Sequence, residues 1–424
     1  MIKIRQWRNN PTAISGFLYT SSSLIKSFVG IVSGFLVLRY VAPEEIGIWQ
    51  AFFIISTYAG FLNAGVPSGL NREIPFLFGK GMKEKAFEMA AAAKYFSQVC
   101  GGIAFLAMAL GTALMLYFQQ PWRNILAFSG VLVLVALEFL YGYYIVLYRT
   151  NEAFRDFSKV NIAESVLLVG LFPAIIYFGF TGFVVYKVLT SLIFLLLLKF
   201  YNPIKVRASF NRKHIVDLIK IGLPIAVMGY LYGIGKSFIK FALLYHGGVL
   251  LLGVFAPVFA IISAIKILPK TLARFFYPKF SYELGKTGDT RQLWKKVQRI
   301  SFYLAIMLCL FFIPVIFLIP FFIETFLPKY TESIFAAQMV TLSALIASSF
   351  LGVHALNSLK AYKGRLIITL IYLITAAAFP FSLPLFFQNP IIGISVSLVV
   401  VDIVNFVVSY FVTRYSLLNA KTIG

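Results

Sequence analysis

Residues 250–276 read LLLGVFAPVFAIISAIKILPKTLARFF, a stretch that joins a long apolar run to a row of cations. Lys266, Lys270 and Arg274 recur every four residues, so a helix would place them along one face. The run before them is apolar enough to lie in a bilayer. The stretch therefore predicts a membrane helix with one positively charged side.

The composition of the whole chain agrees with a membrane location. Of 424 residues, 60% are hydrophobic and only 12% are charged, whereas about a quarter of the residues in a soluble domain are charged. Cys100 and Cys309 lie in apolar runs and give no disulfide framework, and the three histidines are too far apart in sequence to suggest a metal site. We expect an integral membrane protein without a metal centre, and no cleaved signal peptide, because no cleavage site follows the first apolar run.

About twelve apolar runs are long enough to span a bilayer. Short, charge-poor links follow the odd-numbered runs, and longer basic links follow the even-numbered ones. The expected spans are 12–38, 45–70, 89–118, 124–148, 160–178, 182–200, 218–244, 250–277, 300–323, 333–356, 365–387 and 391–413.

The distribution of positive charge predicts the topology. The termini and the basic links together carry 27 Lys and Arg residues, whereas the opposite side has only Arg39, Arg123 and Lys329. By the positive-inside rule, both termini should lie in the cytoplasm of a multi-pass protein of the inner (plasma) membrane. The same asymmetry accounts for most of the net charge of +23, so the lipid bilayer is the expected partner and no nucleic acid is.

An internal repeat predicts the domain organisation. The sequence IGIWQAFF from Ile46 resembles LGVFAPVF from Leu252, and the glycines of the two copies, Gly47 and Gly253, are 206 residues apart. Two Gly-Lys pairs, which begin at Gly79 and Gly285, have the same offset. An offset near half the chain predicts an all-α protein with two pseudo-symmetric six-helix lobes, residues 1–205 and 206–424, around a central cavity.

The first copy also resembles a known family. From Leu38, the sequence LRYVAPEEIGIWQAFFIISTYAGFLNAGVPSGLNREIPFLFGKG is similar to the first hairpin of the polysaccharide and O-antigen lipid-linked oligosaccharide flippases. This family belongs to the multidrug/oligosaccharidyl-lipid/polysaccharide exporter superfamily. The sequence YPKFSYELGKTGD from Tyr277 resembles its second-lobe counterpart. The residues that carry the first resemblance are Pro43, Glu44, Glu45, Gly47, Gly65, Arg72 and Gly79.

The resemblance implies a flippase that works by alternating access, with a cavity lined mainly by spans 1, 2, 7 and 8. The implied cargo is a polyprenyl-pyrophosphate-linked oligosaccharide that moves from the inner to the outer leaflet. Related peptidoglycan-precursor flippases usually have two more spans, so an O-antigen or other surface-polysaccharide unit is favoured. Other proteins of polysaccharide assembly are candidate partners.

Most of the cations inside apolar runs fall on the spans that the resemblance places around the cavity. A charge that faces lipid costs roughly 2.5–3.5 kcal/mol, so such side chains should face protein or water, where they could hold a pyrophosphate. Anchoring at the membrane interface is the alternative for each, and we expect Lys26 and Lys236 to face each other across the lobes. The predicted substrate-binding residues are Lys26, Lys236, Lys240, Lys266, Lys270, Arg274 and Arg72.

Three acids, Glu138, Glu164 and Asp402, lie within the predicted spans. One interpretation is a structural pair with Lys187 or a backbone donor. The other is a coupling site for sodium or a proton, for which Asp402 is the better candidate. No cofactor and no catalytic residue is predicted.

Two other functions remain open at this stage. An ion-coupled drug or organic-cation exporter of the same superfamily would need acidic cavity residues, and Asp217 is the nearest example. A membrane enzyme of polysaccharide assembly would need a large external loop or a nucleophile beside a base, and the sequence suggests neither. No Gly-Lys pair has the P-loop spacing of an ATP-driven pump, so we expect a secondary transporter rather than an enzyme.

Overall fold

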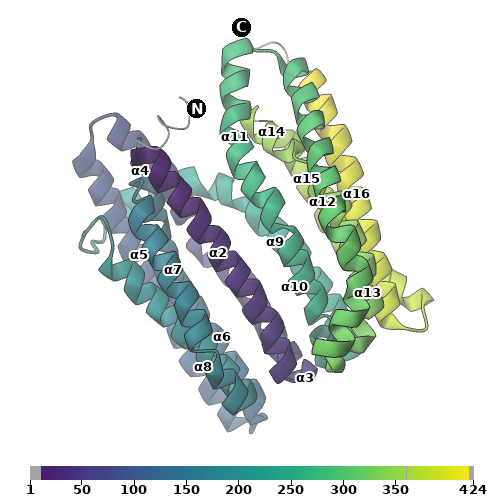
Figure 1. The fold of residues 1–424 in the computed structure, drawn as a ribbon. Coiled ribbons are helices and arrows are strands. Elements are labelled where there is room, and N and C mark those ends of the chain that lie inside the picture. Colours follow the sequence, from purple (N-terminus) through teal and green to yellow (C-terminus); the bar gives the residue numbers. More distant parts are fainter. Residues whose placement is uncertain (1–10, 360, 420–424) are drawn as a thin grey trace. The chain divides into compact units, whose positions relative to one another are not determined.

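The computed structural model describes residues 11–359 and 361–419, and every element in these ranges is helical (Figure 1). Within them, eleven helical segments are long and apolar enough to cross a membrane. The chain is therefore a multi-pass integral membrane protein with an all-α fold, as its composition predicts. The cytoplasmic location of the termini stays a prediction.

The chain divides into two compact units. The N-unit comprises Met1–Val41 and Ile48–Tyr230, and the C-unit comprises Ala42–Gly47 and Leu231–Gly424. Helix α3 (Pro43–Ala59) therefore begins in the C-unit and continues into the N-unit, whereas α9 (Arg212–Val254) runs from the N-unit into the C-unit. The predicted boundary between two lobes, near residue 205, was placed from the sequence repeat and stays a prediction.

The N-unit is a bundle in which α5 packs on α6, α2 on α7, and α6 on α8. Its core contains Leu70, Leu147, Tyr148 and Leu198, which are fully buried, and the Tyr148 hydroxyl donates a hydrogen bond to the carbonyl of Leu198 at 3.0 Å. Besides parts of α3 and α9, its elements are α2 (Pro11–Tyr40), η1 (Gly60–Asn63), α4 (Val66–Gly79), α5 (Lys83–Tyr117), α6 (Trp122–Thr150), α7 (Phe154–Gly170) and α8 (Pro173–Phe200).

The C-unit packs α12 on α13, α13 on α16, and α15 on α16. Ile265, Leu308 and Ala344 lie in one of its buried clusters, which links α10, α12 and α13. Besides parts of α3 and α9, its elements are α10 (Ala256–Ile265), α11 (Ile267–Thr287), α12 (Thr290–Phe326), η2 (Pro328–Ser333), α13 (Ile334–Ser349), α14 (Gly352–Ser358), α15 (Tyr362–Ser382), η3 (Leu383–Phe386) and α16 (Pro390–Leu418).

Several predicted spans are interrupted. The run 45–70 contains α3, η1 and the start of α4, because Ala64 and Gly65 take left-handed backbone conformations with φ of 46° and 78°. The run 250–277 is divided between α10 and α11 at Lys266. The predicted end of the span 160–178 is wrong, because α7 ends at Gly170 and α8 starts at Pro173. Hydropathy does not detect these breaks, because it averages over a run and does not report the conformation of the backbone.

The glycines of the sequence repeat meet in the C-unit. A Cβ atom added to Gly47 would lie 1.7 Å from the carbonyl oxygen of Val249, and one added to Gly253 would lie 1.7 Å from that of Pro43. Val249 follows Pro43 by the same 206 residues that separate the glycines, so the two contacts are equivalent under the repeat. Only glycine permits so close a backbone approach, which explains why this residue recurs in both copies.

Candidate functional site

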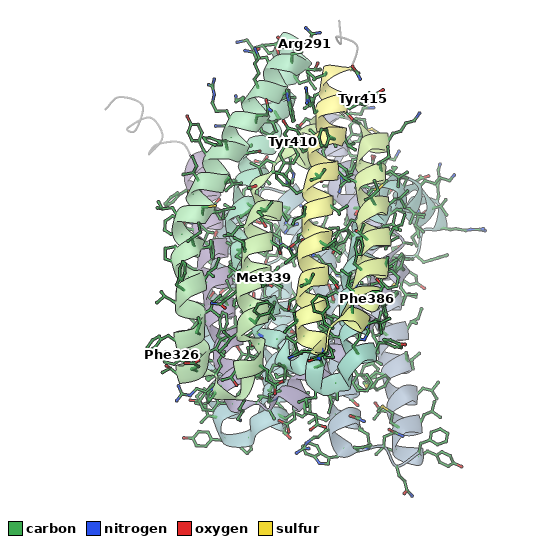
Figure 2. All side chains as sticks on the ribbon, turned by 90° about the vertical axis from the view of Figure 1, so that its right-hand side faces the viewer. Arg291, Phe326, Met339, Phe386, Tyr410 and Tyr415 are labelled. Atoms are coloured by element: carbon green, nitrogen blue, oxygen red, sulfur yellow. The ribbon has the colours of Figure 1, made fainter. Side chains whose placement is uncertain are left out.

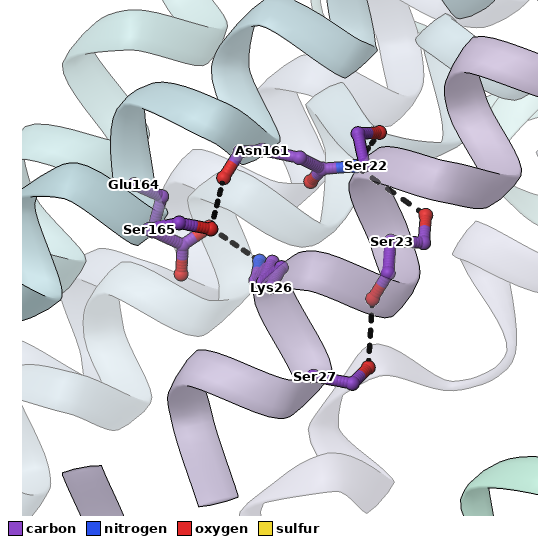
Figure 3. A network of polar contacts seen from close by, with 7 residues as sticks. All are labelled: Ser22, Ser23, Lys26, Ser27, Asn161, Glu164 and Ser165. Carbon is purple, nitrogen blue, oxygen red and sulfur yellow. Dashed lines mark hydrogen bonds and ion pairs between the residues drawn. The ribbon is translucent and has the colours of Figure 1, made fainter. Parts of the chain in front are cut away.

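The first polar site lies in the N-unit between α2 and α7 (Figure 3). Lys26 on α2 forms an ion pair with Glu164 on α7, and their side chains are 31% and 14% exposed. The Lys26 ammonium also lies 4.1 Å from the ring centroid of Phe194 on α8. The ion pair and the aromatic face both stabilise a cation at this depth.

Short polar side chains join the same two helices beside this ion pair. The amide of Asn161 donates hydrogen bonds to the hydroxyls of Ser22 at 3.3 Å and Ser23 at 3.4 Å. On α7, the Ser165 hydroxyl donates to the Asn161 carbonyl at 2.8 Å (Figure 3). Lys26 thus belongs to a network in which most polar groups have protein partners.

The sequence suggested Lys187 as a partner for the acids, and for Glu164 this is wrong. Glu164 pairs with Lys26, whereas Lys187 lies 5.6 Å and 5.7 Å from the ring centroids of Phe183 and Tyr186 on its own helix. Glu164 therefore does form an ion pair, but its partner is Lys26, which is one of the predicted substrate-binding residues.

The second polar site lies in the C-unit and is rich in lysine. Lys236 and Lys240 stand one turn apart on α9, and Lys266 occupies the junction between α10 and α11. Lys236 lies within electrostatic range of both Lys266 and Lys270. Lys236 and Lys270 are exposed, and Lys240 and Lys266 are half-buried. Like charges that interact in this way repel one another, so a bound anion would relieve the repulsion.

Asp402 on α16 is the carboxylate of this site. The Ser343 hydroxyl on α13 donates a hydrogen bond to it at 2.9 Å, and Lys266 lies within electrostatic range. In the described part of the C-unit, no ion pair within bonding distance joins Lys236 to an acid. The one carboxylate described here interacts with Lys266, which also interacts with other lysines, so the site keeps an excess of positive charge.

Aromatic rings border the lysines. The ammonium of Lys236 lies 4.6 Å from the ring centroid of Tyr232, and that ring is 4.7 Å from the ring of Tyr372 on α15. Lys240 lies 5.8 Å from the ring centroid of Phe259. The site therefore combines cations with flat apolar surfaces, which suits a ligand that has both an anionic and an apolar part.

Two other predicted residues, Arg72 and Arg274, have no contact at either site that the structure describes. Arg72 on α4 is exposed, and the side chain of Arg274 lies outside the described residues. Lys26 belongs to the N-unit and Lys236 to the C-unit, so their meeting across a cavity stays a prediction. Among the residues described, no group of His, Cys, Asp and Glu side chains gathers as metal ligands would.

Sequence reasoning missed the uncharged members of both sites. Ser343, Tyr232 and Tyr372 carry no charge and look like ordinary helix residues, so no sequence signal marks them. A signal did exist for Ser22 and Ser23, which lie within three consecutive serines in an otherwise apolar run. Such clustered hydroxyls inside a membrane helix indicate a polar contact with a neighbouring helix.

Comparison with known proteins identifies the fold. No family model and no curated protein matches the sequence. The chain resembles an inward-facing multidrug resistance MATE family transporter of the MOP superfamily, with a TM-score of 0.75, 17% identity, and 92% of this chain and 94% of that one covered. The chain also resembles an outward-facing multidrug resistance MATE family transporter, with a TM-score of 0.66 and 16% identity. This match covers 99% of this chain and 98% of that one.

A third structure is a MOP superfamily transporter from Pyrococcus furiosus, described by a reverse polarity of its binding pocket that suggests a different function. Its TM-score is 0.59, with 17% identity and 98% of each chain covered. The chain therefore has the fold of these transporters, and the predicted architecture of about twelve helices is confirmed.

Proposed function

We propose that this chain is a secondary transporter of the plasma membrane that exports an amphipathic organic anion by alternating access. The observation that carries the proposal is the C-unit site, where Lys236 interacts electrostatically with Lys266 and Lys270, and Asp402 interacts with Lys266. Cations within a membrane protein are costly, and they usually serve a ligand or an ion pathway. The chemistry of the site is that of binding rather than of bond cleavage, which supports a transporter over a membrane enzyme.

The structural neighbours favour an exporter over a flippase, because those described by function are multidrug transporters. An organic cation, however, does not suit a site with several ammonium groups. We therefore propose an exporter whose cargo carries the opposite charge. The description of a reversed pocket polarity in one neighbour supports the idea that this fold accommodates either sign of charge.

A lipid-linked oligosaccharide flippase is the second candidate. The same lysines favour it, because a pyrophosphate presents several anionic oxygens to point charges that can move on flexible stems. The first-hairpin motif around Gly47 and Arg72 also supports this candidate. Both candidates require an anionic cargo, and they differ in whether the cargo is a soluble amphiphile or a lipid.

We propose that Asp402 couples export to a gradient of protons or sodium ions. Without cargo, the carboxylate of Asp402 neutralises part of the charge of Lys266 and accepts the hydrogen bond of Ser343. An anionic cargo at Lys266 would compete with this carboxylate and raise its preference for a proton or a cation. Cargo and coupling ion would then influence each other through a shared lysine, which is a coupling free energy between two ligands.

The test uses the purified full chain in sealed vesicles, with a proton or sodium gradient imposed. An anionic dye and a cationic dye of similar size serve as probes. We expect gradient-driven movement of the anion, a large loss in Lys236→Gln/Lys266→Gln, and no change in Lys286→Gln, whose exposed side chain lies at the end of α11. Movement of the cation alone, unaffected by the lysine variants, would overturn the proposed cargo class.

A second measurement separates the two candidates. Wild-type chain and the double-lysine variant are expressed at matched levels in cells of the source species that lack their own polysaccharide flippase. Restoration of surface polymer by the wild type, together with failure to move the soluble anion in vesicles, would favour the flippase. Anion export without surface polymer would favour the exporter.

A further inference from the structure

Helix α12 carries a stripe of cations at one end. It extends over Thr290–Phe326, and its first turns contain Arg291, Lys295 and Arg299, all exposed and spaced by four residues. This spacing places them on one face of the helix. Cations in the first turn oppose the helix dipole, so helix stability does not account for Arg291.

Figure 2 shows Arg291 at one end of α12 and Phe326 at the other. The face of the first turns opposite to the cations is firmly packed. Leu293, Trp294 and Val297 are 2%, 6% and 0% exposed, and they belong to a cluster that includes Leu417 of α16. The Trp294 ring also lies 5.3 Å from that of Tyr410. The basic stripe therefore stands on a helix that the rest of the C-unit holds in place, and it is not part of a loose tail.

The stripe continues into a surface that suits lipid. Further along α12, the same face of the helix carries large apolar side chains that are exposed. They are Phe302, Ile306, Leu310 and Phe317, which are 63%, 50%, 72% and 76% exposed. Exposed apolar side chains of this size on a membrane helix contact acyl chains. The same face changes from apolar to basic at Arg299, which is where a membrane helix leaves the hydrocarbon region and meets the headgroups.

The corresponding helix of the first repeat lacks this stripe. Helix α5 begins at Lys83 and corresponds to α12 in the repeat. At the repeat offset of 206 residues, Arg291 corresponds to Lys85, but Lys295 and Arg299 correspond to the uncharged Met89 and Ala93. The first turns of α5 also carry the acids Glu84 and Glu88. Glu88 also contacts Nε2 of His214 at 3.1 Å. The general preference for positive charge on one side of the membrane would apply to both helices, so it does not explain the difference.

We propose that the Arg291–Lys295–Arg299 stripe of α12 is a binding site for the headgroups of anionic phospholipids in the leaflet at this end of the protein. This site is separate from the proposed transport site. Phosphate oxygens of successive headgroups would accept charge-assisted hydrogen bonds from the three side chains, while the acyl chains lie along Phe302 and Ile306. The partner is thus a lipid with a negatively charged headgroup.

The test titrates phosphatidylglycerol, with phosphatidylcholine as reference, onto the purified full chain in a neutral detergent and follows bound lipid by native mass spectrometry. Each cation near an anionic headgroup contributes about fivefold in affinity. We expect Arg291→Gln/Lys295→Gln/Arg299→Gln to bind phosphatidylglycerol at least about tenfold more weakly, with phosphatidylcholine binding unchanged.

The matched control is Lys80→Gln/Lys83→Gln/Lys85→Gln, which removes three exposed cations at the end of α4 and the start of α5. It should leave phosphatidylglycerol binding unchanged. An equal loss in both triple variants, or a loss in neither, would overturn the proposal. The variant Arg291→Lys/Lys295→Arg/Arg299→Lys keeps the charge, so it should retain binding, and its failure to do so would also count against a headgroup site.

Discussion

Each unit of this protein places a lysine beside a carboxylate within membrane helices, but the charge balance of the two sites differs. In the N-unit, Lys26 and Glu164 form an ion pair, one cation to one anion. In the C-unit, Asp402 interacts with Lys266 and accepts a hydrogen bond from Ser343, while Lys266 also interacts with Lys236 and Lys270. A lysine within an apolar run therefore does not reveal its role until its neighbours are known.

The difference has a physical consequence for any anion that approaches. In the N-unit, an anion would have to replace Glu164, which is tethered beside Lys26 and therefore present at a high effective concentration. In the C-unit, the lysines outnumber the one carboxylate described, so their excess positive charge attracts an anion even while Asp402 stays beside Lys266. We interpret the N-unit pair as a structural element that joins α2 to α7, and the C-unit cluster as the proposed binding site.

The largest expected effect concerns the C-unit. In Lys236→Gln/Lys266→Gln, transport of an anionic dye should fall by about 100-fold or more, because a hydrogen bond to a charged group contributes roughly 1.5–3 kcal/mol. The melting temperature in detergent should change little, since the variant removes repulsion as well as contacts. If the correctly folded variant still transported the anion in vesicles, the C-unit lysines would not be the binding site, and the proposed difference between the two sites would be wrong.

The second prediction addresses the N-unit. Glu164→Ala leaves Lys26 without its partner in a half-buried place, and it should lower the free energy of unfolding by about 3 kcal/mol, the lower end of the range for breaking a buried pair. Thermal unfolding in detergent measures this loss. The control is Glu152→Ala, whose side chain lies in the turn after α6 and makes no ion pair within the described residues. Equal stability of the two variants would refute the structural role.

The third prediction concerns coupling. Asp402→Asn keeps the hydrogen-bonding shape of the side chain but cannot exchange a proton or hold a cation by charge. We expect anion uptake to lose its dependence on the imposed gradient, with a fall of about tenfold in the gradient-driven rate, as for the loss of one charged contact. Anion exchange in the absence of a gradient serves as the internal control. An unchanged gradient dependence would exclude Asp402 as the coupling residue.

The smallest effect is expected from the replacement of the whole N-unit pair. Lys26→Met/Glu164→Leu exchanges an ion pair for apolar side chains of similar size, and such exchanges are often neutral. The free energy of unfolding should stay within about 1 kcal/mol of the wild type, and anion transport should persist. A loss of transport in a stable double variant would show that Lys26 belongs to the binding site, as the sequence had suggested.

The fold could be predicted to a large extent. The apolar runs and the repeat around Gly47 and Gly253 indicated about twelve helices in two related halves, and the structure adds that these glycines meet with their backbones in contact. The breaks at Gly65 and Lys266 escaped prediction. Both occur inside runs whose average hydropathy suffices to span a bilayer, and hydropathy reports the length of a run but not the conformation of its backbone.

The site could be predicted only in part. The sequence indicated which cations are unusual, because a charge within an apolar run is costly wherever it points. The sequence did not indicate which residues these charged side chains contact. Glu164 lies 138 residues beyond Lys26 in the chain, and Ser343 lies 59 residues before Asp402. Such pairs form through helix packing, and the residue types alone allow many other combinations.

Composition and charge distribution were sufficient to establish a membrane protein with many helices, because the transfer of apolar side chains into a bilayer depends on local sequence alone. The assignment of charges to partners required the packed helices. An ion pair depends on which helix faces are apposed, and neither hydropathy nor spacing contains that information. Each apolar segment by itself therefore predicts a membrane location. Only the folded protein shows that the lysine on α2 is paired with a carboxylate, whereas the lysines of the C-unit outnumber theirs.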